Sequence, residues 1–446
     1  MIPRLKLRIL SMLFTVALVV AIGWLVTREP KPVPTWSLPD GSVMSLAGVT
    51  YGAKHKLRYD NRWQDYAAAL LPSKWQAGLG SRIASHRPSG SNAVVVWLWQ
   101  DNTAKNSTIP GMSVYLATAD DNGLEGQVQY GPDDSYSLPN GKTLTGWELR
   151  QIPRTSKEIG VRIYRTLGSH LEPVGEFKIP NKSRKPGVAW KAEALPATRK
   201  TNELEVTLVR LKTGLTGLEA GIGKEKNAKA YTLAVFELKD KGEVTKKWQV
   251  TGIEAVSPNG EFREGESSNS SWKGQQQYYF FPGALWLDEP AWKLKVQVTR
   301  SEDYPAEELW TIKGVPVPGE KGIVKFQAQT NIYGAEIGFQ GVSAAGAKVP
   351  EDWIEFPRET GLHVVAPSSM SDTHLKLIEV KDDQGRKVEV RGVFSVGSTG
   401  GRGATLREIN YAFGVQIPKD AKSLDVTFAF TKSWEVEFLA EPVMGD

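Results

Sequence analysis

The sequence contains no cysteine, and this absence removes several kinds of chemistry at once. It excludes disulfide bonds, thiolate metal sites, cysteine nucleophiles and a lipid-modified N-terminal cysteine. Histidine is also scarce, and no two of the five histidines lie two, three or four positions apart: His55, His86, His170, His363 and His374. The sequence therefore offers no local pair of imidazole ligands for a metal ion.

Motifs for catalysis and cofactor binding are missing as well. There is no phosphate-binding Walker loop and no dinucleotide fingerprint. The fragments nearest to a serine-hydrolase elbow, at Ser343 and Ser398, are not followed by a helical pattern. The acidic clusters 120–123 and 382–385 match hairpin turns better than a calcium loop. The sequence thus predicts no catalytic residues, no cofactor-binding residues, no metal ligands and no cofactor, although a pair of carboxylates brought together by the fold stays open.

Charge is nearly balanced outside the N-terminus. The formal net charge is +5, and Arg4, Lys6 and Arg8 supply three of these charges, which leaves about +2 for the rest of the chain. A protein that binds a polyanion is expected to concentrate Lys and Arg on one face. Because the charges downstream are interspersed, we expect no nucleic-acid partner.

The one long apolar run lies at the N-terminus, from Ile9 to Val26. These eighteen residues would form a helix of about 27 Å, close to the bilayer core of about 30 Å. A cleaved signal peptide is the alternative, but apolar residues continue past the small-residue site Ala21-Ile-Gly23. The pattern favours an uncleaved signal anchor that contacts the lipid bilayer through residues 9–26. Since basic residues precede it, the N-terminus is expected in the cytoplasm and the bulk of the chain outside it.

Downstream, apolar residues recur at every second position between Gly, Asp and Pro turns, which is typical of strands. We therefore expect a mainly β protein with three tandem antiparallel β-sandwich domains, Ig-like or jelly-roll-like, after one N-terminal transmembrane helix. Residues 36–51 predict a hairpin around Asp40-Gly41, and residues 112–119 and 124–130 another around Asp120–Gly123. The expected segments are a basic n-region (1–8), the anchor (9–26), a Pro-rich stalk (27–35), domain 1 (36–180) with a short helix near 61–71, a linker (181–200), domain 2 (201–312), a Pro/Gly linker (313–322) and domain 3 (323–446).

Two patterns recur in the same order and indicate an internal repeat. A closing pattern of strand, turn, strand, connection and strand occurs at 147–179, 285–312 and 413–438. Upstream of each copy lies a hairpin-like segment, at 115–123, 233–242 and 374–390. No reactive side chain recurs in the closing pattern beyond a lysine near the turn, so the pattern predicts structure and not a site.

Fifteen tryptophans are many for 446 residues. Aromatic rings exposed on a β-sandwich can stack on sugars, but six of these tryptophans lie in strand patterns where a core ring is expected: Trp97, Trp99, Trp147, Trp286, Trp310 and Trp434. The candidates for ligand contact are Trp272, which lies in a polar loop segment, followed by Trp292 and Trp353.

The segment Val49-Thr-Tyr-Gly-Ala-Lys-His55, followed by Trp63 and by residues 70–75, resembles an N-terminal block of uncharacterised signal-anchored bacterial proteins built from tandem β-domains. The C-terminal stretch 424–442 is similar to the ends of the same proteins. They carry no assigned activity, so the resemblance implies architecture and location only. It adds His55 to the candidate ligand contacts without giving it a role.

Taken together, these features favour a non-enzymatic scaffold or protein-interaction protein of the bacterial cell envelope. It would be anchored in the inner membrane with its β-domains outside the cytoplasm, and an envelope protein would be its partner. The alternative is an array of carbohydrate-binding β-sandwiches, and an envelope hydrolase comes third.

Overall fold

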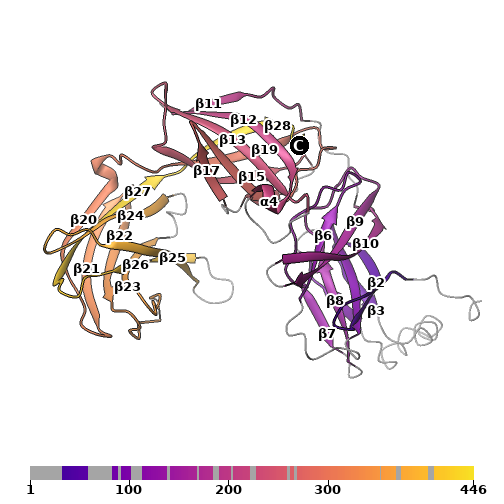
Figure 1. Cartoon of the computed structure of the whole chain (residues 1–446), viewed down its shortest axis with the longest axis horizontal. Coiled ribbons are helices and arrows are strands. Elements are labelled where there is room, and N and C mark those ends of the chain that lie inside the picture. The colour runs from indigo at the N-terminus through magenta and orange to yellow at the C-terminus, as the bar shows by residue number, and fades with distance from the viewer. Residues whose placement is uncertain are drawn as a thin grey trace, which may run out of the picture. The chain divides into compact units, whose positions relative to one another are not determined.

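A computed structural model shows a mainly β chain (Figure 1). It describes residues 33–58, 83–88, 92–101, 113–137, 141–167, 170–183, 190–201, 204–220, 228–258, 262–265, 269–351, 353–367, 373–399 and 406–445. The expected anchor (9–26) and the expected helix near 61–71 lie outside these ranges. Within them the helical segments are short, α4 (Gly217–Ala220) and η2 (Ala306–Glu308), and none is long and apolar enough to cross a membrane.

The chain forms two compact units. The first comprises residues 1–122 and 128–184, and the second comprises residues 123–127 and 185–446. In the first unit, two antiparallel sheets share one core, and we call them the first sheet pair. A five-stranded sheet has the order β1-β2-β5-β8-β7, with β1 (Thr35–Ser37), β2 (Val43–Gly52), β5 (Ala93–Asp101), β7 (Asp134–Ser137) and β8 (Lys142–Glu148). A three-stranded sheet has the order β10-β9-β6, with β6 (Val114–Ala119), β9 (Glu158–Leu167) and β10 (His170–Pro180).

The hairpin expected around Asp40-Gly41 is confirmed, because β1 pairs with β2 in antiparallel register. The buried Asp40 carboxylate accepts hydrogen bonds from the backbone N–H of Ser42 at 3.0 Å and from its hydroxyl at 2.6 Å. Gly41 has a φ of 82°, a conformation that glycine adopts without a steric penalty. Local turn chemistry thus sets the register of the first two strands.

A second hairpin covers the outer face of the five-stranded sheet. It consists of β3 (His55–Arg58) and β4 (Ile83–His86). Ala84 is buried with Val95, Trp97 and Leu144 of the sheet in a small core of their own. A Cβ atom at Gly146 would lie 2.9 Å from the Trp97 ring, so glycine provides the space for this indole. The hairpin therefore gives this sheet apolar packing on both faces.

The second unit contains two further sheet pairs. In the second sheet pair, one sheet follows the path β11-β12-β13-β18-β17, with β14 beside β13 and β29 beside β12. Its strands are β11 (Ala197–Thr201), β12 (Leu204–Leu215), β13 (Tyr231–Asp240), β14 (Glu243–Val244), β17 (Asn269–Lys273), β18 (Gln276–Pro282) and β29 (Val443–Met444). The facing sheet has the order β16-β15-β19-β28, with β15 (Trp248–Val256), β16 (Phe262–Gly265), β19 (Trp292–Arg300) and β28 (Trp434–Ala440).

In the third sheet pair, a five-stranded sheet has the order β21-β22-β23-β26-β25. Its strands are β21 (Ile323–Ile332), β22 (Ala335–Ser343), β23 (Thr360–Pro367), β25 (Glu389–Thr399) and β26 (Leu406–Gln416). The facing sheet has the order β20-β27-β24, with β20 (Leu309–Pro316), β24 (Thr373–Asp382) and β27 (Ser423–Lys432). Residues of both sheets pack into a common core.

The same strand order recurs in all three sheet pairs. Numbered along the chain within each sheet, the five-stranded paths all run first, second, third, fifth, fourth. In the facing sheets, β9, β19 and β27 hold equivalent places, and these are the middle strands of the three closing patterns. The recurring topology explains why the sequence carries the same pattern three times.

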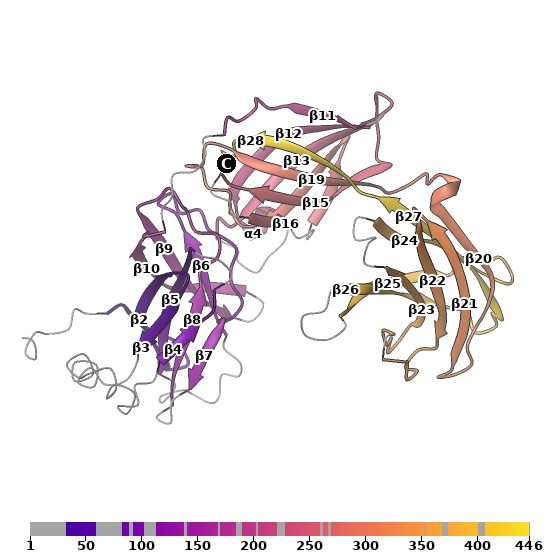
Figure 2. The same cartoon turned by 180° about the vertical axis from the view of Figure 1, so that it is seen from behind.

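The last strand of the closing pattern is exchanged between the second and third sheet pairs. In the first sheet pair, β10 pairs with the preceding β9. In the second unit, β20 pairs with β27 and not with the preceding β19, whereas β28 pairs with β19 and not with the preceding β27. Figure 2 shows the yellow β28 among the strands of the second sheet pair. Its apolar residues lie in the second core: Val436, Phe438 and Ala440.

This pairing differs from the expected domain boundaries of 201–312 and 323–446. Residues 309–312, expected to end the second domain, lie in the third sheet pair, and residues 434–438 lie in the second. The hairpin expected around Asp120–Gly123 also differs. Leu124 is fully buried in the second core and pairs with Lys229, and only Gln129 pairs back with Leu116. Period-two alternation predicts which residues face a core, but it does not say which core.

Candidate functional site

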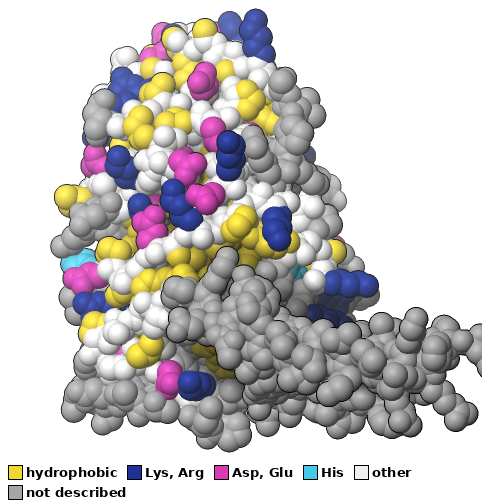
Figure 3. Space-filling model, turned by 90° about the vertical axis from the view of Figure 1, so that its right-hand side faces the viewer, with side chains coloured by type: hydrophobic (Ala, Val, Ile, Leu, Met, Phe, Trp, Pro, Cys, Tyr) yellow, Lys and Arg dark blue, Asp and Glu magenta, His cyan; other side chains and the backbone are white. Residues whose placement is uncertain are grey.

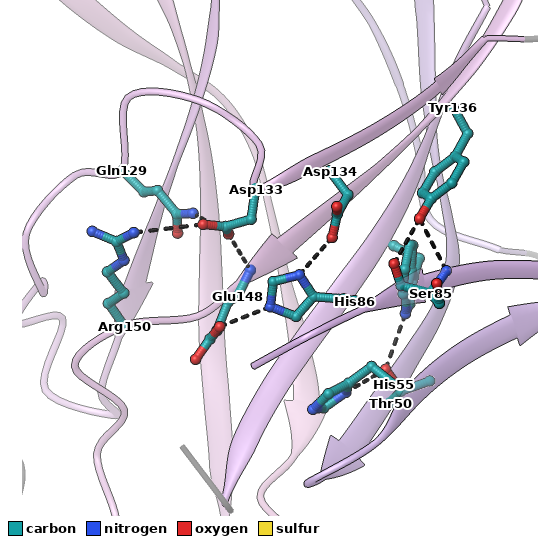
Figure 4. A network of polar contacts seen from close by, with 11 residues as sticks. Thr50, His55, Ser85, His86, Gln129, Asp133, Asp134, Tyr136, Glu148 and Arg150 are labelled. Atoms are coloured by element: carbon teal, nitrogen blue, oxygen red, sulfur yellow. Dashed lines mark hydrogen bonds and ion pairs between the residues drawn. The ribbon is translucent and has the colours of Figure 1, made fainter. Parts of the chain in front are cut away.

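The clearest polar cluster of the first unit lies where the β3–β4 hairpin meets the five-stranded sheet (Figure 4). His55 and His86 are directly opposite each other on β3 and β4. Their rings meet edge to face, with centroids 6.0 Å apart. His55 is almost fully buried, and the His86 side chain is 8% exposed. Strand pairing thus joins two histidines that lie 31 positions apart in the sequence.

His86 lies between two carboxylates that come from neighbouring strands. Its Nδ1 is 2.5 Å from an oxygen of Asp134 on β7, and its Nε2 is 2.7 Å from an oxygen of Glu148 on β8. Ionised carboxylates only accept hydrogen bonds, and both ring nitrogens of histidine donate only when the ring is protonated. The geometry therefore selects an imidazolium held by two anions.

The pKa of His86 agrees with this assignment. Burial lowers it, but the hydrogen bonds and negative charges of Glu148 and Asp134 outweigh burial and raise the pKa above its ordinary value. Both contacts are charge-assisted, which makes them stronger than hydrogen bonds between neutral groups. They fasten β4 to two strands of the sheet beneath it.

His55 is in the opposite state. Burial lowers its pKa and the nearby His86 adds to this, although a hydrogen bond to the Gly52 carbonyl works against it. In the neutral ring, Nε2 donates to that carbonyl oxygen at 2.7 Å, so Nδ1 must accept from the Thr50 hydroxyl at 2.8 Å. The Thr50 oxygen in turn accepts from the Trp97 indole N–H at 3.0 Å. In the neutral state favoured by the lowered pKa of His55, the Thr50 hydroxyl therefore donates to the ring and accepts from the indole.

A second group of contacts holds the acidic side of the cluster in place. The Asp133 carboxylate accepts a hydrogen bond from the backbone N–H of Glu148 at 2.7 Å and one from the Gln129 amide at 2.8 Å, and it contacts Arg150 at 3.5 Å. The Tyr136 hydroxyl donates to the carbonyl of Ser85 at 2.6 Å and accepts from its N–H at 3.0 Å. Glu148 is therefore fixed from its backbone, and β4 is fixed at Ser85 as well as at His86.

The arrangement holds a proton and joins strands. Both nitrogens of His86 are occupied by carboxylates, and both nitrogens of His55 are occupied by neutral partners. Among the residues that the structure describes, no group of three or more His, Asp or Glu side chains could hold a metal ion. The cluster thus has the chemistry of a charged clasp between a hairpin and a sheet.

A second polar pair lies on the outer face of the third sheet pair. The Ser343 hydroxyl is 2.9 Å from Nε2 of His363, and the His363 ring stacks on Trp353 with centroids 4.0 Å apart. A Cβ atom at Gly361 would lie 2.8 Å from His363 and from Ser343, so glycine makes room for the pair. Ser343 is fully buried and His363 is 2% exposed, and burial lowers the pKa of His363 to about 4. The Ser343 hydroxyl is thus closed off from solvent in this structure.

The candidate ligand contacts from the sequence occupy different environments. Trp292 is fully buried in the second core, and Trp353 is 9% exposed against His363, so neither presents a ring face to a sugar. Trp272 is half-buried against the second core, with the Lys246 ammonium 5.8 Å from its ring centre. His55 lies within the cluster described above.

The acidic turns use their carboxylates locally. Asp120 accepts hydrogen bonds from the backbone N–H and the side-chain amide of Asn122. Asp382 accepts from the backbone N–H groups of Gln384 and Arg386 and pairs with the Arg386 guanidinium at 2.6 Å. These oxygens stabilise the turns in which they lie.

Sequence reasoning selected His55 but not its neighbours His86, Asp134 and Glu148. His86 lies in a polar stretch, and each carboxylate lies in an alternating strand pattern typical of solvent-facing positions. Only the order of strands across the sheet brings them together, and no short-range spacing reports that order. Compared with models of known protein families the chain matches none, and no curated protein is significantly similar to it.

Proposed function

We propose that the chain is a membrane-anchored, non-enzymatic scaffold of a cell envelope, with three β-sandwich domains that bind a partner protein outside the cytoplasm. The observation that carries the proposal is how the chain uses its reactive side chains. Ser343 and His363 are buried against each other, and His86 is enclosed by two carboxylates. Groups that could perform chemistry hold elements together instead, which suits a protein that presents surfaces.

The exchanged strands add support. Because β20 and β28 each complete a sheet in the neighbouring pair, the second and third sheet pairs cannot separate without losing strands. A scaffold benefits from such a connection, since a partner that binds one pair is then linked to the other. The membrane location rests on the apolar run 9–26 and the basic residues before it.

The character of the surface favours a protein partner over a polyanion or a sugar. On the face shown in Figure 3, Lys and Arg side chains are interspersed with Asp and Glu, and hydrophobic side chains gather in a band between them. Many basic residues are paired with acidic ones, as in Lys295–Glu254 and Lys293–Glu437. Of the three tryptophans proposed to contact a sugar, Trp292 and Trp353 are buried and only Trp272 is partly exposed. A scaffold is therefore the better supported function.

Topology can be tested directly because the chain has no cysteine of its own. The exposed Lys419 is replaced by Cys in one variant, and Pro3 is replaced by Cys in another. In intact cells, a membrane-impermeant maleimide should label Lys419→Cys, whereas Pro3→Cys should react only after the cells are opened. Protection of Lys419→Cys in intact cells would contradict the proposed location.

Partner binding needs a separate measurement. A photo-crosslinking amino acid is placed at Tyr130 and, in a second variant, at Tyr333, which are 60% and 43% exposed. One recurrent protein adduct in membranes is expected, and the same probe at buried Trp97 serves as the control. Saturable oligosaccharide binding or substrate turnover, without any protein adduct, would overturn the proposed scaffold function.

A further inference from the structure

We propose that Asp134, His86 and Glu148 form a proton-dependent clasp, which holds the β3–β4 hairpin closed over the outer face of the five-stranded sheet. The geometry carries this proposal. One cation on the hairpin lies between two anions on β7 and β8, at 2.5 and 2.7 Å. Removal of the proton from His86 leaves two carboxylates facing a ring that can donate only one hydrogen bond.

The hairpin depends on this contact more than an inner strand would. In the described residues β3 and β4 pair with each other as a two-stranded sheet, and they are not part of the five-stranded sheet beneath. An isolated two-stranded hairpin is only marginally stable in water. A small apolar core around Ala84, the His55 hydrogen bonds to β2, the Tyr136–Ser85 hydrogen bonds and the His86 clasp hold it in place.

Charged and titratable groups from several elements lie around His86. β3 contributes His55, and β4 contributes His86 itself. β7 contributes Asp134 and Tyr136, and β8 contributes Glu148. Asp133 and Arg150 lie behind Glu148, and β2 and β5 contribute the neutral Thr50 and Trp97. The balance next to the hairpin is therefore one imidazolium against two carboxylates, with a neutral histidine beside them.

This arrangement is most stable in a window of pH. The pKa of His86 is raised, so its contribution is complete below the ordinary pKa of 6.5 and is lost as the pH rises through its folded value. The pKa of His55 is lowered, so its contribution is complete above 6.5 and is lost as the pH falls through its folded value. On the acid side, two imidazolium rings would face each other on opposite strands.

Hydrogen exchange of the full-length protein tests the clasp. Backbone protection of residues 83–86 is measured between about pH 5 and about pH 9, corrected for intrinsic exchange rates, with β9 as an internal reference. In the native chain, protection should pass through a maximum and fall on both sides, whereas protection of β9 should stay level. Protection of residues 83–86 that is constant across this range would overturn the proposal.

Variants separate the clasp from general acid or base sensitivity. His86→Gln should speed exchange at residues 83–86 about tenfold or more at neutral pH, because charge-assisted hydrogen bonds are lost, and the alkaline decline should vanish. Glu148→Gln, which keeps the histidine, should weaken that decline even if His86→Gln fails to fold. His170→Gln on β10 of the same unit is the matched control and should leave the profile unchanged. An alkaline decline that persists in both clasp variants would refute the role of His86.

Discussion

Single residues in this chain show polar chemistry used for packing. Ser343 and His363 share a hydrogen bond, and the Trp353 ring stacks on His363. Both residues of the pair are buried. Buried polar groups are tolerated when they satisfy each other, and removing only one partner leaves the other unsatisfied. The stacking of Trp353 on His363 therefore holds the connection between β22 and β23 against the sheet.

Acid should destabilise the second unit through His363. Its pKa is lowered to about 4 in the folded chain, against 6.5 as the ordinary value. The unfolded chain therefore takes up a proton first as the pH falls, and stability decreases between about pH 6.5 and about pH 4. At one pKa unit per 1.36 kcal/mol, the full loss is about 3 kcal/mol. Urea unfolding at several pH values measures it.

Paired substitutions identify the source of this acid sensitivity. The double variant Ser343→Ala with His363→Phe removes both polar groups and should reduce the decline in stability between about pH 6.5 and about pH 4, leaving the part that His374 contributes. His363→Phe alone leaves the buried Ser343 hydroxyl unsatisfied, at a cost of about 1–3 kcal/mol. An unchanged slope in the double variant would assign the acid sensitivity to other groups.

For single residues, the sequence pattern predicts burial within strands better than burial in the connections between strands. Trp97 and Trp147 lie in alternating or apolar runs, and both are core residues as the pattern indicates. Trp353 lies between strands in a polar stretch, yet it is buried because its segment folds back over a glycine-lined face of the sheet. This packing of the connection on the sheet is a tertiary contact, and the local sequence pattern does not predict it.

Among elements, the entry of β28 into the second sheet pair has a simple chain-length cause. Leu167 and His170 pair across two residues, the shortest common loop for an antiparallel hairpin, so β10 can fold back on β9. Only Ser433 separates β27 from β28, which is too short for such a hairpin. The chain must continue in its direction and enter the next sheet. The sequence signal for this pairing is that no stretch of turn residues precedes Trp434.

The exchange predicts which core depends on the C-terminal strand. Phe438 is 1% exposed in the second core, so Phe438→Ala should destabilise the second sheet pair by about 3–5 kcal/mol. Hydrogen exchange should then show the loss of protection in β15 and β19, which lie far from Phe438 in the sequence. Glu435→Ala, an exposed change on the same strand, should shift stability by less than about 0.5 kcal/mol. Loss of protection confined to β24 and β27 would contradict the exchange.

For the molecule as a whole, the exchange turns two repeated modules into one body. β19 and β20 follow each other along the chain, as do β27 and β28, and the first two strands pair antiparallel with the last two. Either core loses a strand if the other opens. This agrees with residues 185–446 forming a single compact unit, whereas residues 128–184 belong to the other unit.

The cysteine-free chain allows a direct test of this connection. Gln297 and Glu435 are exposed partners on β19 and β28, and Thr311 and Thr427 are partners on β20 and β27. The Cα atoms of directly opposite residues in an antiparallel pair lie about 4.5–5.5 Å apart, a separation that a disulfide can span. Both pairs of Cys substitutions should therefore cross-link within one chain under mild oxidation.

The control combines one residue from each pair, Glu435→Cys with Thr427→Cys, which lie on strands of different sheets and should stay reduced. Peptide mapping under non-reducing conditions identifies the bonds formed. Without the exchange, β28 would fold back on β27, and Gln297→Cys with Glu435→Cys would then give no intrachain bond. With the exchange, that bond joins residues 138 positions apart. It should raise the unfolding temperature of the second and third sheet pairs together, because neither core can open without the shared strands.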